Sequence, residues 1–172
     1  MDQEALVALI PRLRRYARAL TGERFRADDL VQDTLERALS KWALWRPGTD
    51  LRAWTFTIMH NVFVNQVRRA ALAPESLDPD AGLEMEDGGA SADTLAQLNA
   101  LNSALQRLPD EQREVLLLVT LEGFSYDEAA HTLGLPIGTV MSRLARGRAR
   151  LALLLEGNGA AGATQVQLKV VK

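Results

Sequence analysis

The residues best suited to chemistry in this chain are basic and hydroxylated side chains near its C-terminal end. The stretch from Pro136 to Leu151 contains four arginines and no acidic residue. Arginine binds guanine edges through paired hydrogen bonds, and both arginine and small hydroxyls bind phosphate oxygens. A solvated basic face on an ordinary surface helix is the alternative interpretation. The candidate DNA-binding side chains here are Thr139, Ser142, Arg143, Arg146, Arg148 and Arg150.

The residues around these arginines have the pattern of two helices joined by a tight turn, over residues 125–150. Ser125 and Glu128 match a capping box at the start of the first helix. Gly134 is placed to end that helix in a left-handed conformation, and Pro136 is suited to the beginning of the next one. A short helix after a tight turn fits the DNA major groove, so this spacing favours DNA binding. The apolar stripe expected to be buried comprises Ile137, Val140, Leu144, Leu151 and Leu155.

A second group of candidate side chains lies between residues 46 and 69. Residues 46–50 form a turn-rich loop, and a helix is predicted over residues 51–69. That helix carries aromatic, amide and basic groups, which suit single-stranded nucleic acid because bases stack on rings while cations neutralise the backbone. Trp54 is more simply a core residue, whereas Phe56 and Phe63 could either pack in a core or stack on bases.

Two further predicted helices complete the first part of the chain. Residues 3–20 have one apolar face, and the arginines at 12, 14, 15 and 18 are interpreted as a solvated face. Asp28 can cap the next helix, which is expected to run to about Trp42. Acidic residues near its N-terminus suit the helix dipole, but the acidic ridge continues beyond the first turn. This exposed face comprises Asp29, Gln32, Asp33, Glu36 and Arg37.

Composition limits the function classes that remain. The chain has 172 residues, 47% hydrophobic residues and no cysteine, which excludes disulfides, thiolate metal sites and cysteine nucleophiles. His60 and His131 lack metal-ligand spacing and are interpreted as surface or packing residues. With no nucleophile–base pair and no phosphate-binding loop, we expect neither catalytic residues, nor a metal, nor a cofactor. The N-terminus is unlike a secretory signal, and no apolar run approaches membrane-spanning length, so a cytoplasmic protein is expected.

The net charge of −2 conceals an uneven distribution. Residues 73–93 contain seven acidic residues and no basic one, which predicts a flexible linker. The rest of the chain has 20 basic and 15 acidic residues. We therefore predict an all-α protein with two small domains: residues 1–72, the linker 73–93, a four-helix domain at 94–156, and a flexible tail at 157–172. The tail glycines match G-x-G-x-x-G, but they follow a helix and lack the βαβ context of a dinucleotide site.

Four segments in this order resemble the sigma-70 superfamily of bacterial sigma factors, in the small two-domain extracytoplasmic-function group. They are ADDLVQDTLERAL (27–39), LRAWTFTIMHNVFVNQVRR (51–69), LPDEQREVLLL (108–118) and FSYDEAAHTLGLPIGTVMSRLARGRARL (124–151). The resemblance covers about residues 3–155. It implies a sigma region 2 helical bundle followed by a region 4 domain, and a regulated alternative sigma factor of a stress or envelope response.

The resemblance also implies partners and residue roles. The acidic ridge would dock on the clamp helices of the largest RNA polymerase subunit, and the second domain would meet the flap region. The helix-turn-helix would read the −35 element of promoter DNA, and an anti-sigma factor would restrain the protein. The loop at 46–50 would help to capture a flipped base. Candidates for −10 recognition and melting are Thr49, Asp50, Phe56, Asn61, Phe63, Asn65, Arg68 and Arg69.

Two other functions stay open at this point. A sigma mimic that binds only an anti-sigma protein would not need the arginines at 143, 146, 148 and 150. A free-standing repressor that uses only the helix-turn-helix would leave the first seventy residues and their acidic ridge unexplained.

Overall fold

The computed structural model describes residues 2–73 and 89–158, and all regular structure within these ranges is helical. The N-terminal half comprises α1 (Asp2–Thr21), α2 (Arg24–Ser40), the short 3₁₀ helix η1 (Trp42–Leu44) and α3 (Leu51–Leu72). The C-terminal half comprises α4 (Ala92–Gln106), α5 (Asp110–Thr120), α6 (Tyr126–Leu133) and α7 (Ile137–Asn158). The all-helical prediction is confirmed for the described residues. Most of the predicted linker and tail lies outside them.

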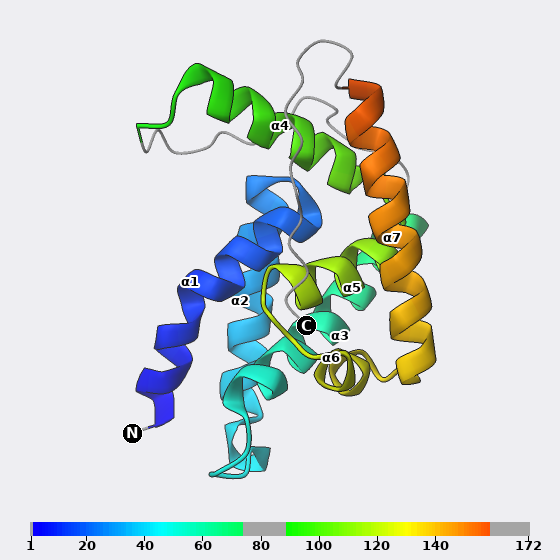
Figure 1. The fold of residues 1–172 in the computed structure, drawn as a ribbon. Coiled ribbons are helices and arrows are strands. Elements are labelled where there is room, and N and C mark those ends of the chain that lie inside the picture. The colour runs from blue at the N-terminus through cyan, green and yellow to red at the C-terminus, as the bar shows by residue number, and fades with distance from the viewer. Residues whose placement is uncertain (1, 74–88, 159–172) are drawn as a thin grey trace.

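The N-terminal half is a bundle in which α2 packs against both α1 and α3 (Figure 1). Its most deeply buried side chains include Leu13, Leu20, Leu30 and Met59, each with no exposed surface. Pro11 lies inside α1, which is a single continuous helix. Apolar residues three and four apart thus form the buried faces, as helical periodicity predicts.

The start of α2 differs from the sequence prediction. Asp28 does not cap this helix, because α2 begins four residues earlier, at Arg24, with Glu23 at the N-cap position. The chain reverses just before it at Gly22, which has a φ of 72°. That left-handed conformation is accessible to glycine without steric cost. Asp28 is therefore an exposed residue within the helix.

The C-terminal half packs α5 and α6 against α7, with α4 crossing the far end of this group (Figure 1). Val115 and Val140 have no exposed surface, and Leu116 and Leu144 are 2% exposed. Helix α4 begins at Ala92, capped by the Ser91 hydroxyl, so the last two residues of the predicted linker are helical.

Arg113 fixes the turn between α4 and α5. Its guanidinium pairs with Asp110 and donates to the carbonyl oxygens of Leu105 and Leu108, at 3.4 and 3.2 Å. Burial lowers the pKa of Arg113, and the charge of Asp110 opposes that shift. This buried arginine of α5 thus ties the last turn of α4 and the loop after it to the start of α5.

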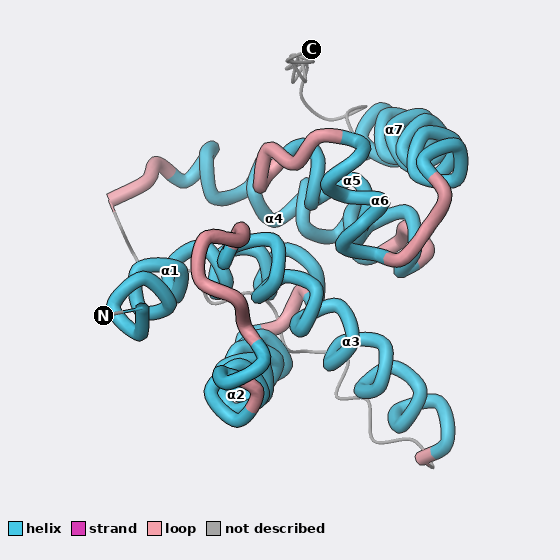
Figure 2. Tube along the Cα trace, turned by 90° about the horizontal axis from the view of Figure 1, so that it is seen from below, coloured by secondary structure: helices cyan, strands magenta, loops and turns pink. Residues whose placement is uncertain are grey.

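The two halves are not separate in space. Helix α1 contacts α4 and α5, and α3 contacts α6, so the halves lie side by side (Figure 2). Their buried apolar side chains form one continuous cluster, which Phe56 of α3 and Phe124 before α6 join with ring centroids 5.4 Å apart.

Candidate nucleic-acid and polymerase interfaces

The turn between α6 and α7 has the predicted helix-turn-helix geometry. The Ser125 hydroxyl accepts from the Glu128 N–H at 3.1 Å, and the Glu128 carboxylate accepts from the Ser125 N–H at 2.8 Å. This reciprocal pair is the expected capping box. Gly134 ends α6 with a φ of 64°, and α7 begins directly after Pro136. These local predictions are confirmed.

Loss of this cap should weaken the domain measurably. Ser125→Ala removes the acceptor for the Glu128 N–H, so we expect the free energy of unfolding to fall by about 1 kcal/mol. Urea denaturation followed by circular dichroism measures the change. Ser103→Ala, at an exposed site inside α4, is the matched control and should stay within about 0.5 kcal/mol of the unsubstituted protein. Equal effects of the two substitutions would contradict a capping role.

Helix α7 has one buried face, as its apolar spacing predicts, with one correction. Val140 is fully buried, Leu144 and Leu151 are each 2% exposed, and Leu155 is partly buried. Ile137 is 41% exposed, so the prediction that it is buried is wrong. It is the first residue of α7, and the buried stripe starts one turn later.

The candidate −35 residues differ in how freely they are presented. Arg146 and Arg150 are exposed, whereas Thr139, Ser142, Arg143 and Arg148 are partly buried. The Arg143 guanidinium lies 3.6 Å from the Glu111 carboxylate of α5, and the Ser142 hydroxyl donates to the Thr139 carbonyl at 3.1 Å. Arg146 and Arg150 are therefore the arginines of this set most available to a ligand.

The acidic face of α2 remains accessible to a partner. Asp29, Gln32 and Glu36 are exposed, and Asp33 and Arg37 are partly buried. Gln66 of α3 donates from Nε2 to both Asp29 and Asp33, at 3.2 and 2.9 Å. This contact orients two carboxylates of the ridge. The pairing joins residues more than thirty positions apart, so helical periodicity gives no sign of it.

The loop before α3 is braced by aromatic rings and by local hydrogen bonds. Trp42 contacts Trp45 and Trp54, with ring centroids 5.4 and 6.1 Å apart. The Thr49 hydroxyl donates to the Arg46 carbonyl, and Asp50 caps α3 by accepting from the Ala53 N–H at 3.2 Å. Thr49 and Asp50 are both exposed. Asp50 thus has a structural role in addition to any contact with DNA.

The candidate −10 residues on α3 separate into two sets. Asn61, Arg68 and Arg69 are exposed and Asn65 is partly buried. Phe56 and Phe63 are only 1% and 4% exposed. Of the two alternatives for these phenylalanines, packing is the one observed, so neither ring is presented to a DNA base in this arrangement.

Phe56 packs at the meeting point of α1, α3 and the C-terminal half. Its ring meets Tyr16 edge-on at 5.1 Å on one side and Phe124 at 5.4 Å on the other. Burial raises the pKa of Tyr16 well above its usual value, and the charges of Glu114 and Glu122 add to this effect. The Tyr16 phenol therefore stays neutral and serves as a packing group.

Family models match both halves of the chain. Residues 6–60 match the Sigma2 domain of PhyR, and residues 98–151 match Sigma-70, region 4. The chain is 39% identical over 158 residues to the ECF RNA polymerase sigma factor EcfG of Rhodopseudomonas palustris (strain TIE-1), which covers 92% of this chain and 87% of that relative.

Two solved structures have the same architecture. The sigma factor RpoE from Bartonella quintana, crystallised with the anti-sigma factor NepR, is 34% identical with a TM-score of 0.76, covering 91% of this chain and 98% of that one. CnrH, in complex with the cytosolic domain of CnrY, is 31% identical with a TM-score of 0.64, covering 91% and 90%.

These matches define a sigma-type initiation factor with sigma2 and region 4 parts. The chain belongs to the ECF family of RNA polymerase sigma factors. It is not an enzyme but a protein that directs transcription initiation. Across the described residues, every helix is too short or too polar to cross a bilayer.

Proposed function

We propose that this sigma factor binds core RNA polymerase through the acidic face of α2 and reads two promoter elements with α3 and α7. The observation that carries the proposal is that these surfaces remain accessible while the apolar faces of the same helices are buried. Exposed carboxylates on α2 suit a basic partner, and exposed arginines on α7 suit DNA. The first domain is taken as residues 1–72 and the second as 94–156.

The −35 element is assigned to α7. Thr139, Ser142 and Arg148 are partly buried and suit phosphate contacts that set the helix in the groove. Arg143 can reach DNA only after leaving Glu111, since the two side chains are paired. Arg146 and Arg150 are therefore the strongest candidates for reading bases.

Arg146→Ala should weaken −35 recognition. If the guanidinium is bidentate to a guanine, we expect a loss of about 1–3 kcal/mol that is confined to promoters with the cognate base. Competition binding of the holoenzyme to cognate and substituted promoters measures it. Arg14→Ala, an exposed arginine on α1, is the charge-matched control. A uniform loss over all sequences would instead assign Arg146 to phosphate contact.

The −10 element is assigned to the loop before α3 and to the exposed side of α3. Thr49 and Asp50 lie at the loop and help to capture an extruded base. Asn61 and Asn65 offer amide groups to base edges, and Arg68 and Arg69 neutralise the backbone. Phe56 and Phe63 are left out of this surface because both rings are buried.

The proposed protein partners are the clamp helices of the largest polymerase subunit for α2, the flap region for the C-terminal half, and an anti-sigma factor. The anti-sigma partner is supported by the sigma factor from Bartonella quintana, whose solved structure is a complex with NepR. A protein with these partners acts in the cytoplasm, where polymerase and chromosome are.

Reconstitution tests the proposal. Mixed with core RNA polymerase purified from Rhodopseudomonas palustris and with genomic DNA, the protein should direct initiation at promoters that share two elements. Sequencing of the transcripts identifies these elements. Binding of NepR without any initiation would support the second candidate, a sigma mimic, which is suggested by the match of residues 6–60 to the Sigma2 domain of PhyR.

A further inference from the structure

Two large apolar side chains are exposed at the start of α7, the helix assigned to the −35 element. Ile137 is 41% exposed and Met141 is 49% exposed. The two residues are one helical turn apart, so they lie on the same side of the helix. We call this pair the apolar shoulder (Ile137 and Met141). Single exposed apolar residues are normal on protein surfaces, so position rather than exposure decides what this pair does.

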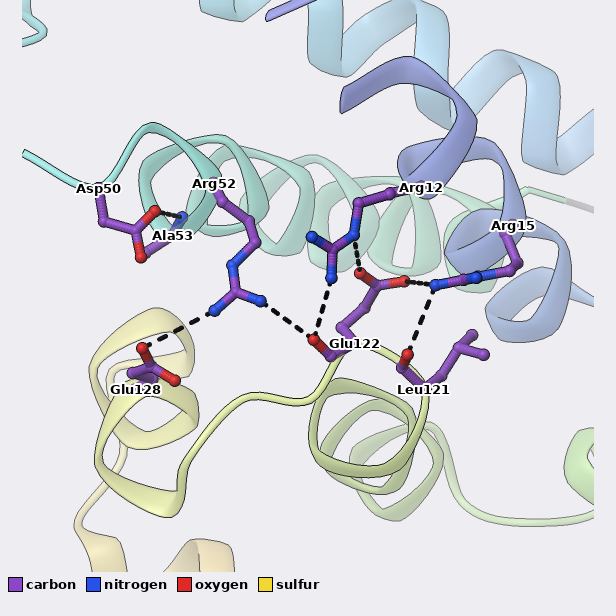
Figure 3. Close-up of polar contacts among 8 residues, drawn as sticks. All are labelled: Arg12, Arg15, Asp50, Arg52, Ala53, Leu121, Glu122 and Glu128. Carbon is purple, nitrogen blue, oxygen red and sulfur yellow. Dashed lines mark hydrogen bonds and ion pairs between the residues drawn. The ribbon is translucent and has the colours of Figure 1, made fainter. Parts of the chain in front are cut away.

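The N-terminal half of the protein does not cover the apolar shoulder. Among the described helices, those that pack on α7 are α4, α5 and α6. The N-terminal half instead meets the turn before α6. There, Arg12 and Arg15 of α1 and Arg52 of α3 bind the buried Glu122 (Figure 3). The shoulder is therefore exposed even though the two halves are packed together.

The outward face of α7 has an apolar edge and a basic edge. At about 3.6 residues per turn, the apolar shoulder falls along one edge of this face, and Arg146 and Arg150 fall along the other. The positions between the two edges hold small residues, which are Gly138, Ser142, Ala145 and Ala149. Small side chains leave room for a ligand to approach the helix closely, so residues on both edges can reach the same ligand.

Gly138 is a second sign of close approach from outside. It lies in the first turn of α7 and is not in the left-handed region. A Cβ atom at this position would have open space around it, with no atom of a neighbouring helix within 4 Å. The described fold therefore gives no packing reason for a glycine here, whereas a ligand that lies against the backbone does.

The DNA major groove offers one kind of apolar group to such an edge. Each thymine presents its C5-methyl there, whereas the other bases present hydrogen-bond donors and acceptors. In a helix-turn-helix, the N-terminal residues of the second helix contact base edges, and the apolar shoulder lies in the first two turns of α7. A methionine side chain is unbranched and flexible, so Met141 can adapt its shape to a methyl group.

We propose that Met141, supported by Ile137, is a specificity-determining residue that packs against the C5-methyl group of a thymine in the −35 element. This inference rests on the proposed function of α7 and adds an apolar contact to the hydrogen bonds assigned to its arginines. Since arginine binds guanine, the two edges of α7 select different bases. The −35 element therefore contains an A·T pair where it meets the start of α7.

Deoxyuridine substitution tests this contact, because uracil lacks the methyl group but pairs with adenine as thymine does. Each thymidine of the −35 element, on either strand, is replaced in turn in promoter duplexes. Competition binding then measures the affinity of the holoenzyme for each duplex. One replacement should lower the affinity about fourfold, the effect expected when one methyl-sized apolar group loses its contact. With Met141→Ala in the holoenzyme, the same replacement should have no effect.

Three variants show whether the effect belongs to the apolar shoulder. Met141→Leu keeps an apolar side chain of similar size and should keep the preference for thymine over uracil. Ile137→Ala should weaken this preference without abolishing it. Leu153→Ala removes a side chain that is 69% exposed near the other end of α7, and it should change neither affinity nor preference. Circular dichroism confirms that each variant folds.

Several results would overturn the inference. A holoenzyme whose affinity is unchanged by every deoxyuridine replacement makes no methyl contact, and a −35 element composed wholly of G·C pairs offers none. A thymine preference that persists in Met141→Ala belongs to another residue. If Met141→Ala weakens polymerase binding and leaves the preference intact, the shoulder meets a protein instead. A holoenzyme that prefers no −35 sequence at all would reject the proposed function of α7 itself.

Discussion

Asp33→Lys is expected to abolish detectable binding to core RNA polymerase and, with it, promoter-dependent transcription. Asp33 lies at the centre of the acidic face of α2, and the substitution replaces an anion with a cation at a surface proposed to meet basic residues. Removal of one partner from a hydrogen-bonded interfacial charge pair costs about 2–5 kcal/mol, which is roughly 30-fold or more in affinity. Reversal of the charge adds repulsion. Fluorescence-anisotropy titration with core enzyme measures the change.

Three controls separate this effect from damage to the fold. Gln66→Ala removes the internal donor to Asp29 and Asp33 but keeps both carboxylates, so polymerase should still bind. Glu4→Lys makes the same change of net charge at an exposed site on α1 and should have little effect. The isolated C-terminal domain, if it folds alone, should keep its DNA affinity. Unchanged polymerase binding by Asp33→Lys would remove α2 from the proposed interface.

Leu144→Ala should lower the free energy of unfolding by about 2–5 kcal/mol. Leu144 is 2% exposed and belongs to the buried stripe that holds α7 against α5 and α6. Its truncation removes apolar contacts and leaves a cavity that the rigid helices fill only in part. Since a small domain has about 5–15 kcal/mol of stability in total, α7, the proposed reader of the −35 element, should lose much of its order. Urea denaturation measures the free energy of unfolding, and a promoter-binding assay measures the loss of affinity for DNA.

Leu153→Ala is the matched control for this prediction. It makes the same truncation in the same helix at a residue that is 69% exposed, so the free energy of unfolding should change by no more than about 0.5 kcal/mol. Comparable losses from the two substitutions would contradict the assignment of the buried face of α7.

Helix boundaries and caps were predictable where the deciding contacts are local. The capping box at Ser125 and Glu128 and the left-handed Gly134 involve residues within one or two turns of each other, so residue type and spacing identify them. The predicted start of α2 was wrong because the local sequence signal for that boundary was ambiguous. Asp28 is a good capping residue by type, but α2 extends past it because Gly22 already reverses the chain.

Helical periodicity predicted which faces of the helices are buried, but it did not predict the burial of every residue on them. Periodicity identified the buried stripe of α7 but overextended it to Ile137. For Phe56 and Phe63, residue type alone permitted either stacking on bases or packing, because an aromatic ring suits both. The packing of α3 against α1 and the C-terminal half decided the question.

The helical class and the faces that bear carboxylates and arginines follow from the amino-acid sequence, because they depend on neighbours within a few residues along one helix, and the family follows from the order of four such segments. The contacts of Arg12 and Arg15 depend instead on how the helices pack. Their spacing predicted a solvated face, and the two side chains are 40% and 55% exposed, but both also bind Glu122 more than a hundred residues away. A pairing across that separation has no periodicity to reveal it. It exists because the halves fold against each other and a carboxylate buried between them needs cations.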